Sequence, residues 1–126
     1  MKNEDIVTYD QAVKLKELGF DWDCNYFYHL YDELATLSTL PKYENFNKFD
    51  KNWSAPTLAQ VQKWLFEKCD VWIEISLLNF PNNFGYEIKC DYHTKDRYCC
   101  QGYYSPTHAL SAGIDDAIDC IRNEHF

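Results

Sequence analysis

Cysteine and histidine side chains that could hold a metal ion gather in the last third of the chain. Thiolate and imidazole are the ligands that zinc prefers, and five such residues lie within nineteen positions: Cys90, His93, Cys99, Cys100 and His108. Their spacing argues against a shared site. Cys90 and His93 are three positions apart on an expected strand, so they face opposite sides of it, and no C-x-x-C pair is present. We expect no metal site and no cofactor.

The patterns that mark catalytic centres are also missing from the sequence. It contains no G-x-S-x-G elbow, no H-E-x-x-H helix and no glycine-rich phosphate loop, and it has only four glycines. Asp115 and Asp116 are adjacent on an expected helix, so their carboxylates diverge and do not form an acid–base pair. We therefore expect no catalytic residues and a protein that is not an enzyme.

Aromatic residues make up 17% of the chain and are the second group of side chains that could form a functional site. The polar, asparagine-rich stretch "KYENFNKFDKNWS" predicts a long loop, and it contains Tyr43, Phe46, Phe49 and Trp53. Their spacing of three, three and four also suits one face of a short helix. Either these rings pin the loop to the core or they form a partner-binding surface, because aromatics anchor interfaces. A second candidate patch is formed by Phe80 and Phe84.

The elements that would position these residues begin with a helix over residues 9–18. Thr8 and Gln11 have the spacing of a capping box, and Gly19 favours a left-handed C-cap onto which Phe20 can fold back. The next stretch, "YFYHLYDELATLSTL", is ambiguous. It predicts either a hairpin of residues 26–31 and 34–40, with a turn near Asp32–Glu33, or a helix over residues 30–37. In both cases Pro41 ends the element.

The C-terminal half predicts a helix, three strands and a second helix. Pro56 precedes the helical pattern "TLAQVQKWLFEK", whose first residue Thr57 is the expected cap, and Ser105 and Pro106 have the types that begin the last helix. Between them, alternating residues predict an antiparallel meander. In its first strand one face is apolar: Val71, Ile73, Ile75 and Leu77. The expected elements cover residues 57–68, 71–78, 86–93, 97–104 and 106–122, with a tight turn at 94–96.

Helix, three strands and helix is also the element order of double-stranded RNA-binding domains. Those domains contact phosphates with lysines at the start of the last helix, whereas this helix begins "SPTHAL" and continues with three aspartates. Phosphates would be repelled there. We expect no nucleic-acid binding. The helix should instead cover one face of the sheet with an apolar stripe (Leu110, Ile114, Ala117, Ile118, Ile121) and carry Asp115, Asp116 and Asp119 on its far side.

Charge and composition limit the protein class further. The net charge is −8, and the acids are spread evenly along the chain among twelve Lys and Arg residues. Such a surface disfavours nucleic acids and anionic membranes as partners. The start "MKNEDIVTYDQ" has no apolar region of a signal peptide, and no stretch is long and apolar enough to span a membrane. We expect a cytoplasmic protein whose six cysteines are reduced thiols.

Three blocks of the sequence carry a resemblance: "VTYDQAVKLKELGFDW", "SAPTLAQVQKWLFEK" and "YYSPTHALSAGIDDAIDCI". They are similar to short uncharacterised proteins of gut bacterial genomes and their phages or integrated elements, in which "TYEQA..LKELGF", "APTYSQAFRWFREK" and "YDSYEEAELECL" recur in this order. Residues 24–53 match that group poorly, and "SPTHAL" replaces its more acidic "SYEEA". The resemblance implies a phage or mobile-element origin, and no cofactor or site residue comes with it.

Together these patterns predict one α+β domain over residues 1–126. A small antiparallel sheet, formed by a three-stranded meander with a possible additional hairpin, should be packed by helices in the order α-(ββ)-α-βββ-α. The expected function is a non-catalytic module that binds another protein or itself. The alternative is an acidic mimic of nucleic acid that inhibits a host enzyme, although the evenly interspersed bases argue against it.

Overall fold

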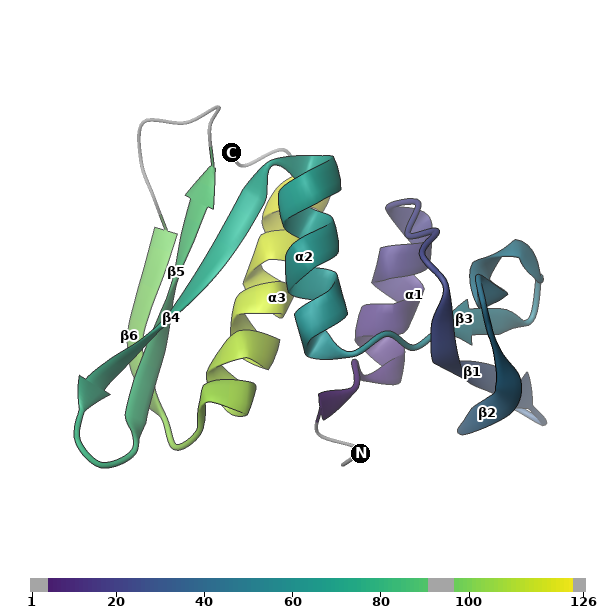
Figure 1. Cartoon of the computed structure of the whole chain (residues 1–126), viewed down its shortest axis with the longest axis horizontal. Helices are drawn as coiled ribbons and strands as arrows, with labels where there is room; N and C mark the ends of the chain where they lie inside the picture. Colours follow the sequence, from purple (N-terminus) through teal and green to yellow (C-terminus); the bar gives the residue numbers. More distant parts are fainter. Residues whose placement is uncertain (1–4, 91–96, 124–126) are drawn as a thin grey trace. The chain divides into compact units, whose positions relative to one another are not determined.

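The computed structural model describes residues 5–90 and 97–123, and the side chains of all of these except 97–101. The fold class is mixed α+β and the predicted order of elements is confirmed, with three α helices and two antiparallel three-stranded sheets in the described residues (Figure 1). The elements are α1 (Tyr9–Glu17), β1 (Cys24–Tyr31), β2 (Leu34–Glu44), the 3-10 helix η2 (Phe46–Lys48), β3 (Asn52–Ser54), α2 (Leu58–Cys69), β4 (Val71–Asn79), β5 (Asn83–Cys90), β6 (Arg97–Tyr103) and α3 (Pro106–Arg122).

Contacts along the chain group it into two compact units, residues 1–57 and residues 58–126. Unit 1 contains α1 and the sheet β2-β1-β3, and unit 2 contains α2, α3 and the sheet β4-β5-β6. Each unit therefore has its own sheet and its own α helix or helices. That all 126 residues form one domain stays a prediction.

Helix α1 in unit 1 has the predicted ends. Thr8 Oγ1 accepts a hydrogen bond from the Gln11 N–H at 3.1 Å, and Gln11 Oε1 accepts one from the Thr8 N–H at 2.9 Å, which completes the capping box. Gly19 has a φ of +92°, a conformation that glycine adopts without strain. The Phe20 N–H then donates to the Leu15 carbonyl at 3.0 Å, and both side chains are buried. The predicted C-cap is confirmed.

The hairpin alternative for residues 26–40 is confirmed, and the helical alternative is wrong. Strands β1 and β2 pair antiparallel around the turn residues Asp32 and Glu33, whose φ angles are +49° and +67°. Positive φ at both positions is typical of a type I′ turn, whose twist matches that of the flanking strands. Cross-strand pairing of the aromatic-rich strand β1 thus overrides the helical preference of the leucines in β2.

Two expectations for the end of this hairpin are wrong. Pro41 does not end the element, because β2 continues to Glu44. Tyr26 pairs with Thr39 but Cys24 pairs with Glu44, so residues 40–43 bulge opposite Asn25, and a bulge has no need of a proline N–H. The predicted loop over residues 42–54 also contains the helix η2 and the strand β3, which pairs with β1.

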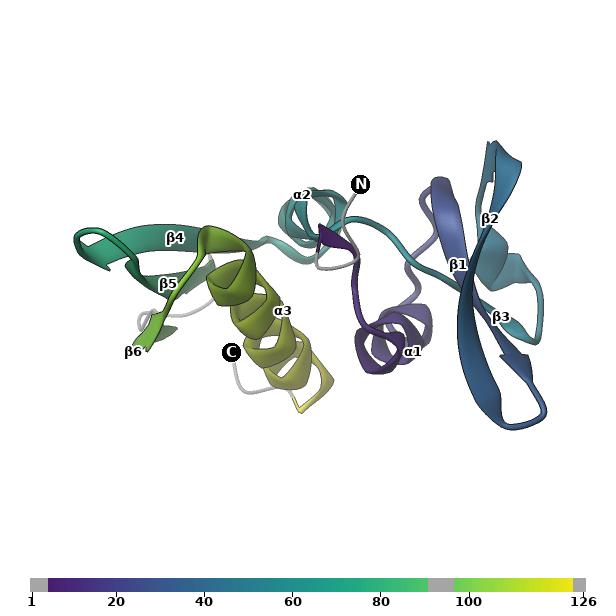
Figure 2. The same ribbon diagram turned by 90° about the horizontal axis from the view of Figure 1, so that it is seen from below.

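In unit 2 the predicted meander is confirmed over the described residues. Strand β4 pairs antiparallel with β5, and β5 with β6. The expected residues 91–93 of the second strand and the turn at 94–96 lie outside the described residues. Helix α3 packs on all three strands, and α2 packs on α3 and β4. Both views show the two helices on the same side of this sheet (Figure 1, Figure 2).

Helix α3 covers the sheet through a closely packed face. A Cβ at Gly113 would lie 2.8 Å from Cγ2 of Ile73, so the helix backbone approaches the strand directly at this point. Ile114, Ala117 and Ile118 are buried as predicted, whereas Leu110 and Ile121 are only half-buried. Asp116 does not lie wholly on the far side, because its Oδ2 accepts a hydrogen bond from the Tyr86 hydroxyl at 2.9 Å. Asp115 and Asp119 are exposed.

Candidate functional site

The four aromatics of the 42–54 segment do not form one surface. Phe46 is buried and stacks on Phe27 with ring centroids 4.4 Å apart. Trp53 is half-buried in β3 and meets Tyr9 edge-on at 5.3 Å. Tyr43 and Phe49 remain 56% and 43% exposed. Phe46 and Trp53 thus pin the segment to unit 1, and only Tyr43 and Phe49 present their rings to solvent.

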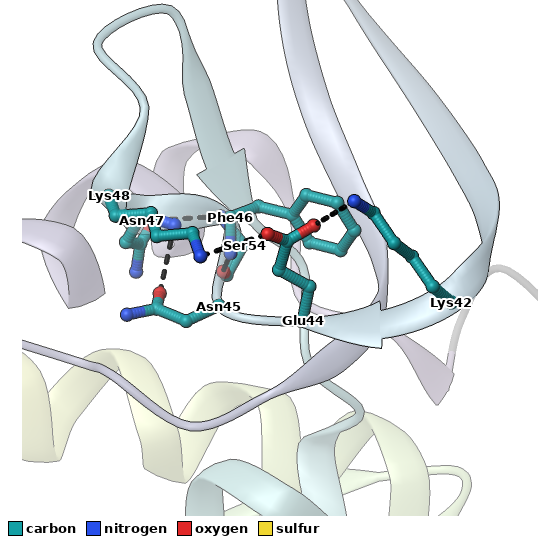
Figure 3. Close-up of polar contacts among 7 residues, drawn as sticks. All are labelled: Lys42, Glu44, Asn45, Phe46, Asn47, Lys48 and Ser54. Atoms are coloured by element: carbon teal, nitrogen blue, oxygen red, sulfur yellow. Dashed lines mark hydrogen bonds and ion pairs between the residues drawn. The ribbon is translucent and has the colours of Figure 1, made fainter.

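Asparagine side chains hold Phe46 in place, as Figure 3 shows. The Phe46 N–H donates to Ser54 Oγ at 3.0 Å, and Asn45 Oδ1 accepts from the Asn47 N–H at 2.9 Å. Asn47 Oδ1 accepts from the Ser54 N–H at 2.8 Å, while its Nδ2 donates to the Phe20 carbonyl at 2.8 Å. An asparagine side chain can accept and donate hydrogen bonds in place of a backbone group of a turn. The asparagines of this segment therefore stabilise an ordered structure.

A small ion-pair network lies beside this turn (Figure 3). Glu44 lies 2.9 Å from Lys42 Nζ and 2.9 Å from Lys48 Nζ, one lysine on each carboxylate oxygen. Hydrogen bonds from Lys48 and then from Lys42 hold the pKa of Glu44 below its ordinary value. The carboxylate is fully engaged within unit 1, which makes it a structural group.

Lys16 makes contacts that could not be predicted from the sequence. Its Nζ donates to the carbonyls of Phe49 at 2.7 Å and of Asn52 at 2.8 Å, and it lies 5.3 Å from the centre of the Trp53 ring. Partial burial lowers the pKa of Lys16, while Asp50 acts in the opposite direction. Lys16 ties α1 to the turn before β3. No local signal could reveal it, because the partners are 33 to 36 positions apart.

The second candidate patch lies where β4 turns into β5. Phe80 is 87% exposed, and Leu77 and Leu78 beside it are 50% and 40% exposed. We call these three side chains the hairpin tip. Phe84 is half-buried and pairs with Leu77 on β4 and with Tyr103 on β6. The hairpin tip is therefore an exposed apolar surface, and the strand position opposite Leu77 carries an aromatic residue.

Leu77 was not predicted at this surface, because alternation places it with Val71 and Ile73 on the buried face. The structure corrects this. Ile73 is fully buried, Ile75 is half-buried and Leu77 is half-exposed, so burial decreases toward the turn. The pairing with β5 is regular through Leu77 and shifts register only between Leu77 and Asn79, so Leu77 keeps the face of Ile73 and is exposed because burial of that face ends before the turn. A signal for the tip does exist in the sequence, since Leu77 and Leu78 come shortly before the turn-forming stretch "NFPNN", which itself contains Phe80.

The cysteines and histidines do not assemble into a site in the part of the chain that the structure describes. His93 and the side chains of Cys99 and Cys100 lie outside it. Among the described residues, no group of three or more His, Cys, Asp or Glu side chains could hold a metal ion. Cys24, Cys69, Cys90 and Cys120 are free thiols, and burial raises the pKa of Cys24 and of Cys69, which disfavours the reactive thiolate.

His108 belongs to a local cluster at the start of α3. Ser105 Oγ accepts from the His108 N–H at 3.1 Å and lies 2.5 Å from His108 Nδ1, and the Tyr104 hydroxyl lies 2.9 Å from Nε2. A serine next to a histidine is a pairing that nucleophilic catalysis uses. Here the serine hydroxyl is the helix N-cap, and the three residues lie within a single turn. The arrangement accounts for the helix start.

Comparison with protein-family models, with curated proteins and with solved structures finds no match to this chain. Within the described residues, no helix is both long and apolar enough to cross a membrane. The candidate site therefore stands on the geometry alone.

Proposed function

We propose that this protein is a non-catalytic protein-binding module and that the hairpin tip is its contact surface. The observation that carries the proposal is the 87% exposure of Phe80 at the end of a paired hairpin, between two leucines and the turn. A phenylalanine with no packing role in its own fold is costly to present to water. It is well suited to enter a pocket on another protein.

The shape of the hairpin tip favours such a contact. Aromatic anchors contribute most of the free energy of many interfaces when neighbouring apolar side chains exclude water around them. Leu77 and Leu78, three and two positions before Phe80 and both exposed, are the apolar side chains available for this role, and β4 pairs antiparallel with β5 on both sides of the turn. A rigid contact surface loses little conformational entropy on binding.

Ion pairs elsewhere on the chain support this function over mimicry of nucleic acid. Mimicry requires rows of carboxylates that stay available to a basic partner. Glu74 instead lies 2.8 Å from Lys89, and Asp10 lies 3.1 Å from Lys14. Together with the two lysines on Glu44, these contacts interrupt the acidic surface with bases.

The proposal is tested by affinity capture from bacterial lysate with immobilised wild-type protein and two variants. Phe80→Ser removes the central ring of the hairpin tip. Phe66→Ser is the matched control, because Phe66 is 55% exposed but lies on α2. We expect a partner that is retained by wild type and by Phe66→Ser and lost with Phe80→Ser. Capture that is unchanged by Phe80→Ser, or no retained partner at all, would exclude the proposed surface.

A further inference from the structure

Strand β2 leaves one edge of the unit 1 sheet open for pairing. The strand order is β2-β1-β3, so β2 is an outer strand. Its residues 34–40 read "LATLSTL", a segment with no charge, glycine or proline. All seven are exposed or half-exposed. Open edges are normally protected by lysine, proline or a covering element, and an unprotected one is a template for another strand.

Two other outer strands show what such protection looks like. In unit 2 the Gln62 amide donates to the Ile73 carbonyl of β4 at 2.6 Å. In unit 1 the Lys16 ammonium donates to the Asn52 carbonyl of the three-residue strand β3 at 2.8 Å. On β2 the proline and the lysine come only after the seven-residue segment, as Pro41 and Lys42.

The hairpin turn fixes which backbone groups of β2 face the open edge. In a hairpin closed by two residues, the residues that flank the turn form a hydrogen-bonded pair, here Tyr31 with Leu34. Backbone groups alternate in direction along a strand, so the even-numbered residues of the segment bond to β1. The N–H and C=O groups of Ala35, Leu37 and Thr39 therefore point outward.

The segment is close to symmetric about Leu37, and this symmetry identifies the strand that fits it. An antiparallel second copy, aligned with Leu37 against Leu37, places like with like. Leu34 lies opposite Leu40, Ala35 opposite Thr39, and Thr36 opposite Ser38. Because Leu37 is one of the outward-facing residues, this register also makes the central pair a hydrogen-bonded one. Apolar and hydroxyl pairs of this kind are favourable across antiparallel strands.

The charges that flank the segment are complementary in the same arrangement. Asp32 and Glu33 precede it, and Lys42 follows it. In an antiparallel pair, Lys42 of the second copy lies near Asp32 and Glu33 of the first copy. By symmetry, Lys42 of the first copy lies near the two acids of the second. The Lys42 ammonium lies 2.9 Å from Glu44 in its own chain, and because its side chain is 60% exposed it can also approach the acids of a second copy. A parallel copy would place acids beside acids.

We propose that the edge of β2 pairs antiparallel with the β2 edge of a second copy of this chain, with Leu37 on the two-fold axis. The two three-stranded sheets of the two copies then join into one continuous sheet. Each copy contributes the outward groups of Ala35, Leu37 and Thr39. This surface lies in unit 1 and shares no residue with the hairpin tip in unit 2, so it does not depend on the proposed function. A contact this small predicts a weak dimer, with a dissociation constant on the order of 10–100 μM.

The test uses two double variants that alter the same two positions and differ only in charge. Thr36→Lys with Ser38→Lys places lysine opposite lysine twice in the proposed register. Thr36→Lys with Ser38→Glu places lysine opposite glutamate twice. Molar mass is measured by sedimentation equilibrium from about 1 μM to about 1 mM, and circular dichroism confirms that each variant is folded.

We expect the wild type to change from monomer to dimer over this range. The lysine–lysine variant should associate about tenfold more weakly or not at all, and the lysine–glutamate variant should associate at least as well as wild type. Three results would each overturn the proposal: a wild type that is monomeric throughout, a lysine–lysine variant that associates like wild type, or a folded lysine–glutamate variant that stays monomeric. None of these results bears on the capture experiment with Phe80→Ser.

Discussion

The ring of Phe46 stacks on the ring of Phe27 at a centroid distance of 4.4 Å and an interplanar angle of 24°. Both side chains are buried, and with Cys24 they form a small core on one face of the β2-β1-β3 sheet. Phe49, three residues further along, is 43% exposed. Two phenylalanines of one segment thus have opposite roles, and substitution distinguishes them.

Phe46→Ala should lower the free energy of unfolding by about 3–5 kcal/mol, because it removes a buried ring and leaves a cavity. Phe49→Ala is the matched control and should change it by less than about 1 kcal/mol. Chemical denaturation followed by circular dichroism measures both. Equal effects of the two substitutions would contradict the assignment of Phe46 as the core residue of this segment.

Glu44 should make stability depend on acid pH. Because its pKa is lowered in the folded protein by Lys48 and Lys42, the ionised carboxylate stabilises the fold above the pKa of the unfolded chain. That contribution is lost as the pH falls through the folded pKa. Melting temperatures at pH 7 and about pH 3 should therefore differ less in Glu44→Gln than in wild type. Glu67→Gln, an exposed position on α2, should leave the difference unchanged. An unaltered difference in Glu44→Gln would show that the two lysine contacts do not form in solution.

Gly113→Val should destabilise unit 2. The added Cβ would lie 2.8 Å from Cγ2 of Ile73 and 3.2 Å from the Tyr86 ring, so α3 has to move away from the sheet. We expect a loss of about 1–3 kcal/mol in the free energy of unfolding. Ala112→Val places the same β-branched side chain at the neighbouring half-buried position and should cost about 0.5 kcal/mol through helix propensity, whereas at position 113 valine has the higher helix propensity of the two residues, so a loss there comes from the clash. A Gly113→Val protein as stable as Ala112→Val would mean that the helix does not approach the strand this closely.

The parts of the fold that could be predicted from sequence are those encoded by neighbouring residues. Thr8 and Gln11 specify the start of α1 because their two reciprocal bonds span a single turn. The β1–β2 hairpin around Asp32 and Glu33 was predicted only as one of two alternatives, because the leucines that follow the turn also favour a helix. The buried face of α3 could also be predicted, because Ile114, Ala117 and Ile118 repeat at the spacing of one helix face, and all three are buried.

The parts that could not be predicted depend on contacts between distant residues. Pro41 was expected to end β2, but the bulge that accommodates it exists only because Cys24 pairs with Glu44. The burial of Phe46 depends on Phe27, and the order of the turn before β3 depends on Lys16. The candidate surface was predicted only in part. Phe80 was identified from its place in a turn, whereas Leu77 lies on the apolar face that alternation predicts, and sequence could not show that this face is no longer buried near the turn.

The proposed role of the exposed Phe80 ring is to bind another protein and not to stabilise its own fold. It is tested most directly by measuring partner capture and the unfolding midpoint on the same preparations of wild type and Phe80→Ser. Because the ring is 87% exposed, we expect Phe80→Ser to lose capture while its free energy of unfolding changes by less than about 0.5 kcal/mol. Retained capture, or a loss of capture that is accompanied by unfolding, would contradict it.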